Sequence, residues 1–267
     1  MDNVSCNKID NKINEEIKIS VAIPYYNNSQ FMKETLEPML KDDRINEIVI
    51  VDDCSKDLGN LINLIKNISI DNTKIRLYKN IMNVGVYLNK LKSLSLCNNE
   101  WAILFDSDNK LDKSYIDTLY QNLPWNETYV YAPSWANTLP DYAPYLDYRK
   151  YNNNVIDARK VMELRDEIHF KCMMNTCNYF VNVEKYSECM NKYKEDYNYE
   201  RISSLDSKTL FTDWICEGNS VYVVKDLTYR HRVHPNSNYN LANKSYEKQV
   251  HSMLDKKITD YVNSLTS

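Results

Sequence analysis

The chain has 267 residues, of which 43% are hydrophobic and 26% are charged, so it can form one compact unit with a sizeable core. Its net charge of -4, with no basic block, argues against nucleic acid, which requires clustered Lys and Arg. No window reaches the roughly 18 consecutive apolar residues of a membrane span, and the polar start does not resemble a signal peptide. We therefore expect a cytoplasmic protein with no transmembrane segment, either free or bound peripherally at a cytosolic membrane face.

Cysteine and glycine usage excludes several classes of site. The seven cysteines are scattered and contain no C-x-x-C pair, which argues against zinc and indicates reduced packing thiols. Glycine occurs only three times, so the chain contains neither the G-x-G-x-x-G fingerprint of dinucleotide-binding enzymes nor a P-loop. A dehydrogenase is therefore disfavoured and a P-loop enzyme is excluded.

In chain order, short β-branched and aromatic runs alternate with helical patterns through the first half. Strands are expected at 17–23, 47–51, 74–78, 101–105 and 128–132. Helices are expected at 29–40, 57–68, 85–97 and 112–122. This alternation indicates βαβ units, and hence a parallel sheet covered by helices on both faces. Ligands of such sheets bind at the carboxyl ends of the strands, where Asp52-Asp53 and Asp106-Ser107-Asp108 fall.

The second half is less regular. The segment 131–151 mixes prolines, aromatics and charges, so we expect an irregular wall that faces the substrate. Helices are expected at 157–167, 184–195 and 206–216, and strands at 179–183, 221–224 and 228–233. We divide the chain into a polar arm (1–16), a single domain (17–240) with a nucleotide-binding half (17–125) and an acceptor-binding half (126–240), and a C-terminal helix (241–267) that packs onto the body.

Six motifs, taken in order, resemble those of the inverting glycosyltransferases of family 2, which have the GT-A fold. They are ISVAIPYYNNSQ, EIVIVDDCSKD, NVGVYLNK, WAILFDSDN, FTDWICEG and TYRHRVHPNS. The match is good over 17–122 and thinner afterwards. It implies a Rossmann-like, mostly parallel sheet flanked by helices, with a smaller acceptor-side region. It also implies metal-dependent transfer of a hexosyl or N-acetylhexosaminyl group from a nucleoside-diphosphate sugar, expected to be a UDP-sugar, to a hydroxyl of a glycan or of a lipid-linked or protein-linked acceptor.

The resemblance implies a nucleotide site on the first two strand-end loops. Tyr26 would offer an aromatic face to the base, and Pro24 and Asn27 would shape the same loop. Asp53 would accept a hydrogen bond from the imide N–H of uracil or thymine. The run DDCSKD is also rich in residues that cap helices, so Asp52 and Asp57 have a structural interpretation as well.

The diphosphate side of the donor site would come from the next two motifs. Asn83 and Gly85 begin a helix whose amides and dipole suit an anion. Lys90 lies one turn on, where the family usually has arginine. It would contact the donor, although lysine lacks the planar guanidinium of arginine. The alternative is that Lys90 lies on a solvated helix face. Asp106 and Ser107 would face the ribose and diphosphate.

The metal is expected to be Mn²⁺ or Mg²⁺, because such cations prefer hard oxygen ligands. By resemblance Asp108 is one ligand and His234 is another. His231 lies on the opposite face of the same strand by alternation, and the sequence alone does not decide between the two histidines.

Inversion needs one base that takes the proton of the acceptor hydroxyl. Asp213 fits the position of that base, although Thr212 stands where the family commonly has Glu; Asp206 and Glu217 are the alternatives. The family often has a small Gly-containing loop that surrounds the donor sugar. Its best match here has Cys177 and Asn178 instead, and because these bulkier residues should alter which sugar fits, the identity of the donor sugar stays open.

Two other functions remain to be weighed. A GT-A domain could hold a nucleotide sugar without turnover, or serve as an interaction domain. A processive polysaccharide synthase would need membrane helices and usually a Gln-x-x-Arg-Trp motif, and the sequence has neither. The acceptor, the linkage and the oligomeric state do not follow from the sequence.

Overall fold

The computed structural model describes residues 17–68, 72–139, 144–174, 178–195, 203–235, 237 and 244–265. The strands are β1 (Ile19–Tyr25), β2 (Ile45–Asp52), β3 (Ile75–Lys79), β4 (Trp101–Leu104), β5 (Lys110–Leu111), β6 (Tyr129–Leu139), β7 (Pro144–Asp147), β8 (Val155–Ile156), β9 (Tyr179–Asn182) and β10 (Ser220–Arg232). The helices are α2 (Ser29–Leu40), α3 (Leu58–Asn67), α4 (Val86–Ser95), α5 (Tyr115–Tyr120), α6 (Ala158–Leu164), α7 (Ile168–Met174), α8 (Val183–Tyr193), α10 (Asp206–Cys216) and α12 (Lys244–Ser264), with the short 3-10 turns η1 (Arg149–Tyr151) and η2 (Ser203–Leu205).

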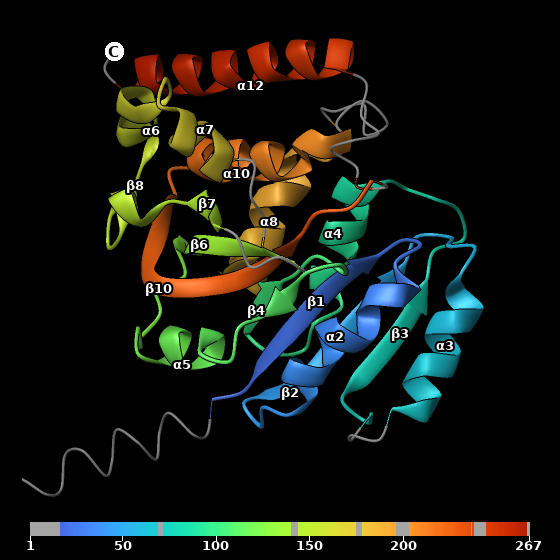
Figure 1. Ribbon diagram of the computed structural model, residues 1–267. Helices are drawn as coiled ribbons and strands as arrows, with labels where there is room; N and C mark the ends of the chain where they lie inside the picture. Colours follow the sequence, from blue (N-terminus) through green and yellow to red (C-terminus); the bar gives the residue numbers. More distant parts are fainter. Residues whose placement is uncertain are drawn as a thin grey trace, which may run out of the picture.

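These strands form one central sheet in the order β3-β2-β1-β4-β9-β6-β10-β5, to which β7 and β8 are attached at β6 and β10 (Figure 1). The nucleotide half is parallel, since β1 pairs in parallel with both β2 and β4, and β2 with β3. Beyond β4 the sheet is mixed, because β9 runs antiparallel to both β4 and β6. The expected Rossmann-like arrangement is confirmed, and its parallel character is strongest in the first half.

Two apolar layers cover the sheet. One joins α2, α3 and α5 to an aromatic group in which the rings of Trp101 and Phe180 stack with centroids 5.2 Å apart and Trp125 meets Phe180 edge-on at 4.6 Å. Such pairs contribute about 0.5–1.5 kcal/mol each beyond their buried area. The other layer joins α4, α8, α10 and α12. The strand ends are therefore held between two packed faces.

The segment 131–151 is more regular than its composition suggests. β6 continues to Leu139 and pairs in parallel with β10 along most of its length, and β7 pairs with β6. Pairing with a distant strand decides strand formation more than local composition does. The expectation of an irregular segment is therefore wrong for residues 131–139 and 144–147, while 140–143 lie outside the described residues.

The last strands and helices also differ from expectation. The two strands expected at 221–224 and 228–233 are one strand, β10, with a register shift between Val224 and Thr228. One helix was expected at 157–167, whereas α6 ends at Leu164 and α7 follows it. The predicted C-terminal helix is α12, which buries Leu254 and Ile258 in the layer that contains α10. The predicted arm at 1–16 lies outside the described residues, and the domain division stays a prediction.

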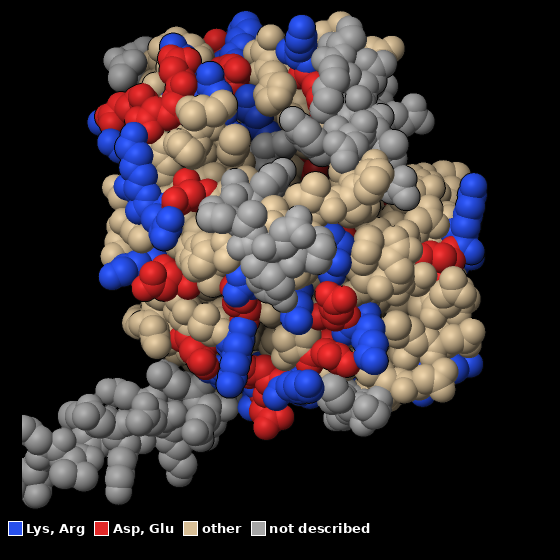
Figure 2. All heavy atoms as spheres, viewed as in Figure 1, with Lys and Arg blue, Asp and Glu red and all other residues tan. Residues whose placement is uncertain are grey.

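The surface matches the weak net charge. Figure 2 shows Lys and Arg interspersed with Asp and Glu on the face in view, with no large area of one sign. In the part of the chain that the structure describes, no helix combines the length and the apolar character needed to cross a membrane.

Candidate active site

The acidic turn after β4 is fixed from three directions. The amide of Asp106 donates to Asn178 Oδ1 (3.0 Å), and Thr35 Oγ1 of α2 donates to the carbonyl of Asn109 (2.7 Å). Asn28 Nδ2 donates to Ser107 Oγ (2.8 Å). The turn is therefore held rigidly at the carboxyl end of the sheet, as the alternating pattern predicted.

Asp108 and His234 meet in this turn. Asp108 Oδ2 lies 3.0 Å from His234 Nε2, and Arg232 Nε donates to the carbonyl of Asp108 (2.9 Å). His231 instead lies beside the hydroxyl of Tyr229 (3.4 Å from Nδ1), and burial lowers its pKa. The structure thus brings together the two residues predicted as metal ligands, and it distinguishes His234 from His231.

The donor set fits a hard divalent cation that also binds a diphosphate. Asp108 Oδ2 and His234 Nε2 lie within hydrogen-bond distance of each other (3.0 Å), so a carboxylate oxygen and an imidazole nitrogen that could serve as two ligands of a cation are side by side. Among the described residues no group of three or more His, Cys, Asp or Glu side chains gathers around one point. A cation here would therefore take its remaining ligands from phosphate oxygens and water, as Mg²⁺ commonly does.

Lys90 connects the acidic turn to helix α10. Its ammonium lies 3.0 Å from Asp106 Oδ1 and 2.5 Å from Asp206 Oδ2, and the residue is only 2% exposed. Burial raises the pKa of Asp106, whereas the positive charge of Lys90 opposes that rise. The alternative of a solvated helix face for Lys90 is therefore wrong. The lysine joins a carboxylate of the sheet edge to a carboxylate of α10.

Asp213 does not lie at this edge. Its side chain is fully buried, its Oδ1 lies 2.7 Å from Lys257 Nζ of α12, and its Oδ2 accepts from Tyr87 (3.3 Å). A base must reach the hydroxyl of an incoming acceptor, and this carboxylate is enclosed between α4, α10 and α12 instead. The assignment of Asp213 as base stays a prediction, and its burial beside Lys257 is the reason to weigh Asp206 against it.

The two alternatives to Asp213 are separated by the same helix. Asp206 is the first residue of α10 and shares Lys90 with Asp106. Glu217 caps the other end, where its carboxylate is held by Lys192 and Tyr193. Of the three carboxylates, Asp206 is the one that the fold brings to the acidic turn.

The loop after β1 carries the predicted contact for the base. Tyr26 follows β1 directly and is 47% exposed. Asn27 has a φ of 53°, its amide donates to Ser55 Oγ (3.0 Å) and its Oδ1 accepts from the amide of Lys56 (2.8 Å). Pro24 lies within β1 opposite Val51. Pro24 and Asn27 thus shape the loop, and the ring of Tyr26 is open to solvent.

Asp53 fixes the loop that starts α4. Its carboxylate accepts from the amides of Val84 (2.8 Å) and Gly85 (2.9 Å) and from Asn80 Nδ2 (2.8 Å), and the residue is 3% exposed. Gly85 adopts φ 85° and ψ 160°, a region essentially restricted to glycine. Asn83 Nδ2 donates to the carbonyl of Asp53 (3.0 Å). Since a carboxylate has about four acceptor positions, about one remains for a base.

Three other side chains near the strand ends have structural partners. Asp57 accepts from the amide of Ser29 (2.8 Å) at the start of α2, and Asp52 accepts from the amide of Ser55 (3.0 Å). Ser107 is 4% exposed, and its hydroxyl accepts from Asn28. Asp57 thus satisfies a free backbone amide at the start of α2 and Asp52 satisfies one in the turn after β2, while the hydroxyl of Ser107 is directed toward α2.

Comparison with known proteins identifies the family. The family model for glycosyl transferase family 2 matches residues 20–186. The chain belongs to this family. Its relatives include an uncharacterised glycosyltransferase of Mycoplasma genitalium, 30% identical over 145 residues (50% of this chain and 48% of that protein). Glycosyltransferase GlyG of Streptococcus pneumoniae is 28% identical over 120 residues (45% of this chain and 39% of that protein). The chain therefore aligns with less than half of the length of these relatives.

Solved structures confirm the GT-A type of fold for this family 2 chain. S. aureus TarS 1-349 in complex with UDP-GlcNAc superposes with a TM-score of 0.62 at 15% identity, over 92% of this chain and 72% of that one. A second structure of TarS 1-349 gives a TM-score of 0.58 at 18% identity, over 81% of this chain and 60% of that one. At this identity the likeness supports the fold alone.

Two residues of this family 2 site have roles that sequence reasoning missed. Asn178 is fully buried, has a φ of 70° and anchors the amide of Asp106. Arg232 fixes Asp108 and also lies over the ring of Phe31, 4.4 Å from its centre. An asparagine in place of an expected glycine signals a left-handed conformation, because Asn tolerates positive φ better than most residues. The contacts of Arg232 have no local signal.

Proposed function

We propose that this chain transfers a sugar from a nucleoside-diphosphate sugar, with UDP as the nucleotide, to a hydroxyl of a glycan or glycoconjugate acceptor. The observation that supports this best is the Lys90 bridge. It joins Asp106 of the acidic turn to Asp206 at the start of α10. Transfer needs a group that binds the diphosphate and a separate carboxylate that takes the proton of the acceptor. The acidic turn would supply the first, and the start of α10 would supply the second.

The donor would lie across the strand ends. In the proposal, Tyr26 stacks on the base, and the last acceptor position of Asp53 takes the imide N–H of uracil. The related fold of TarS has been solved with UDP and with UDP-GlcNAc, which makes a UDP-sugar the natural first donor to test. The dipole of α4, whose first turn follows Gly85, favours the negative charge of the diphosphate.

Asp108 and His234 would hold Mn²⁺ or Mg²⁺. A cation bound there neutralises the negative charge that develops on the departing nucleoside diphosphate. Arg232 keeps the backbone of Asp108 in place by its hydrogen bond to the carbonyl, so the carboxylate stays directed at His234. Lys90 is committed to Asp106 and Asp206, and its proposed role is to position them rather than to contact the donor.

Asp206 would be the base of a single displacement. The ammonium of Lys90 lies 2.5 Å from Asp206 Oδ2 and holds this carboxylate next to the acidic turn. As the acceptor oxygen attacks the sugar carbon, its proton passes to Asp206, and the bond to the diphosphate breaks on the opposite side. The configuration at the sugar carbon is thereby inverted.

The test is a panel of UDP-, GDP- and dTDP-sugars assayed for thermal stabilisation and for nucleotide release, with Mn²⁺ and with EDTA. We expect UDP-sugars to stabilise the protein and to turn over only with metal. Asp108→Ala should abolish metal-stimulated turnover, whereas Asp43→Ala, which removes a fully exposed carboxylate at 101% exposure, should not. Full activity of Asp108→Ala in EDTA would contradict the metal site. Donor binding without turnover would instead indicate a non-catalytic nucleotide-sugar-binding domain.

A further inference from the structure

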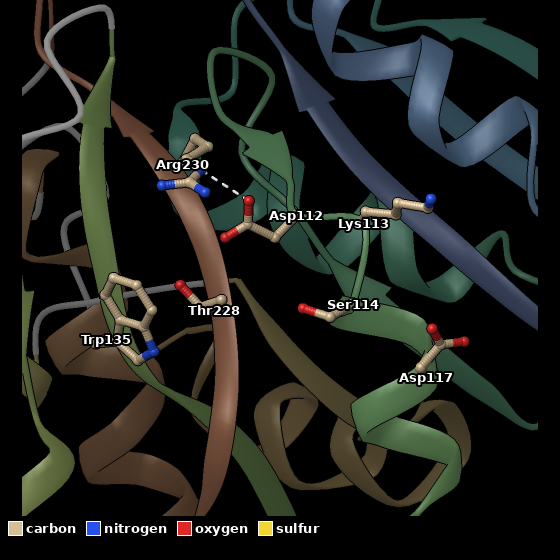
Figure 3. Close-up of a pocket in the computed structure, with 7 residues that line it drawn as sticks. All are labelled: Asp112, Lys113, Ser114, Asp117, Trp135, Thr228 and Arg230. Carbon is tan, nitrogen blue, oxygen red and sulfur yellow. Dashed lines mark hydrogen bonds and ion pairs between the residues drawn. The ribbon is translucent and has the colours of Figure 1, made fainter.

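A cavity of about 430 Å³ lies between α5 and the paired strands β6 and β10 (Figure 3). It is lined by Asp112, Lys113, Ser114, Asp117, Trp135, Thr228 and Arg230. None of these residues belongs to the proposed donor site. A volume in this range suits a small ligand.

Two polar atoms of the lining have no partner among the described residues. They are Thr228 Oγ1 and Asp112 Oδ2, and both are buried. Thr228 is only 6% exposed, although it lines the cavity. Buried hydroxyl and carboxylate oxygens are nearly always hydrogen-bonded in folded proteins, so these two atoms point to a ligand that carries hydroxyl groups.

An aromatic ring lies next to the unpartnered hydroxyl. Trp135 of β6 is directly opposite Thr228 of β10 in the strand register. Figure 3 shows its indole on the same side as Thr228, across the cavity from the loop that carries Asp112 and Ser114. An indole offers a large apolar surface with a fixed shape, which suits the C–H face of a sugar ring.

The charges of the lining nearly cancel. Arg230 Nε donates to Asp112 Oδ1 at 2.7 Å, and Asp117 pairs with Arg44 at 2.7 Å. A phosphate or another strong anion would meet two carboxylates, and a strong cation would meet Arg230 and Lys113. The lining therefore favours a neutral ligand.

We propose that this cavity binds a neutral saccharide unit. Its hydroxyl groups hydrogen-bond to Thr228 Oγ1 and Asp112 Oδ2, and its C–H face packs on Trp135. The cavity is linked to the transfer centre through β10, because Arg230 binds Asp112 while Arg232, two residues later, binds the carbonyl of Asp108. We assign the saccharide to the acceptor, a step that rests on the proposed transferase function, whereas saccharide binding itself does not.

The first test measures, by saturation-transfer NMR, the binding of lactose, cellobiose, maltose and N-acetylglucosamine at millimolar concentration. At least one of them should bind the parent protein. Thr228→Val should weaken that binding about threefold to tenfold, the effect of one hydrogen bond, with no loss of thermal stability because no internal hydrogen bond is removed. Thr212→Val is the matched control: its hydroxyl is also buried and unpartnered among the described residues, but it lies in α10 outside the cavity.

The outcomes separate the cavity from the transfer reaction. Absence of binding by all four saccharides, or equal binding by the parent and Thr228→Val, would overturn the proposal. Loss of saccharide binding in Thr228→Val, in a protein that shows no turnover of UDP-sugars, would support the cavity and refute the transferase. In an active protein, Thr228→Val should raise the KM of the acceptor and leave the KM of the donor unchanged. An unchanged acceptor KM would remove the acceptor assignment.

Discussion

The two ends of helix α10 carry aspartates in opposite situations. Asp206, its first residue, shares the ammonium of Lys90 with Asp106 of the acidic turn. Asp213, about two turns further on and about 10 Å away along the axis, is fully buried and paired with Lys257 of α12. The same residue type on one helix thus has two environments, and the partner lysine distinguishes them.

This difference shows what a sequence motif leaves undetermined. Residues seven apart lie close to the same face of a helix, so both aspartates point toward the layer that contains α4. Which one reaches the sheet edge depends on where α4 and α12 pack against α10. Those contacts join residues that are 116 positions apart for Lys90 and Asp206, and 44 for Lys257 and Asp213.

The largest effect is expected at the Lys90 end. Lys90→Met leaves Asp106 and Asp206 close together without their shared cation. Removing one partner of a buried ion pair costs about 3–5 kcal/mol of unfolding free energy, and the proposed base Asp206 would also lose the contact that positions it beside the acidic turn. We expect a large fall in the free energy of unfolding, measured by urea denaturation, and a large fall in turnover per folded molecule. Parent-like turnover would contradict the bridge as part of the site.

A smaller and purely structural effect is expected at the Lys257 end. Lys257→Met leaves Asp213 as a buried charge without its cation, and since Lys257 is 25% exposed we expect a cost near or below the lower limit of about 3 kcal/mol. Turnover per folded molecule should stay close to that of the parent. The double variant Lys257→Met with Asp213→Leu should recover much of the stability, because neither charge remains. A fall in turnover comparable with that of Lys90→Met would erase the contrast between the two ends.

The smallest of these effects is expected at Asp53, a third buried aspartate whose partners are amides rather than a lysine. Asp53→Asn removes the charge from hydrogen bonds to Val84 and Gly85, and places an amide group against one of these donors. We expect a loss of about 1–3 kcal/mol in stability together with weaker UDP binding. Calorimetry with UDP and melting curves without it measure the two parts. Unchanged affinity for UDP would leave Asp53 with a loop-forming role only.

Much of the nucleotide half could be predicted from the sequence. The alternation of apolar runs and helical patterns placed the first four strands, and the acidic residues after β2 and β4 marked the ligand edge. Asp108 and His234, both predicted as metal ligands, lie next to each other although they are 126 positions apart, and their role as ligands stays a prediction. These features depend on local periodicity and on the common direction of parallel strands.

The acceptor half could not be predicted to the same degree. β6 and β7 form because β10 and β6 supply hydrogen-bond partners from elsewhere in the chain, and the local mixture of prolines and aromatics hides this. The burial of Lys90 follows from packing between α4 and α10, and no local pattern distinguishes it from a solvated lysine. The predicted limits of α10 agree with the structure, whereas the choice between its two aspartates as the base stays a proposal.

The measurement that tests this account most directly compares Asp206→Asn with Asp213→Asn. Calorimetry gives the affinity of each variant for the UDP-sugar, and single-turnover transfer gives the rate per folded molecule. Loss of a general base typically costs about 10²–10⁴-fold in rate. We expect that loss in Asp206→Asn with donor affinity retained, and a rate within a few-fold of the parent in the less stable Asp213→Asn. A collapse of the rate in Asp213→Asn, with Asp206→Asn close to the parent, would contradict the assignment of the base to Asp206 at the start of α10.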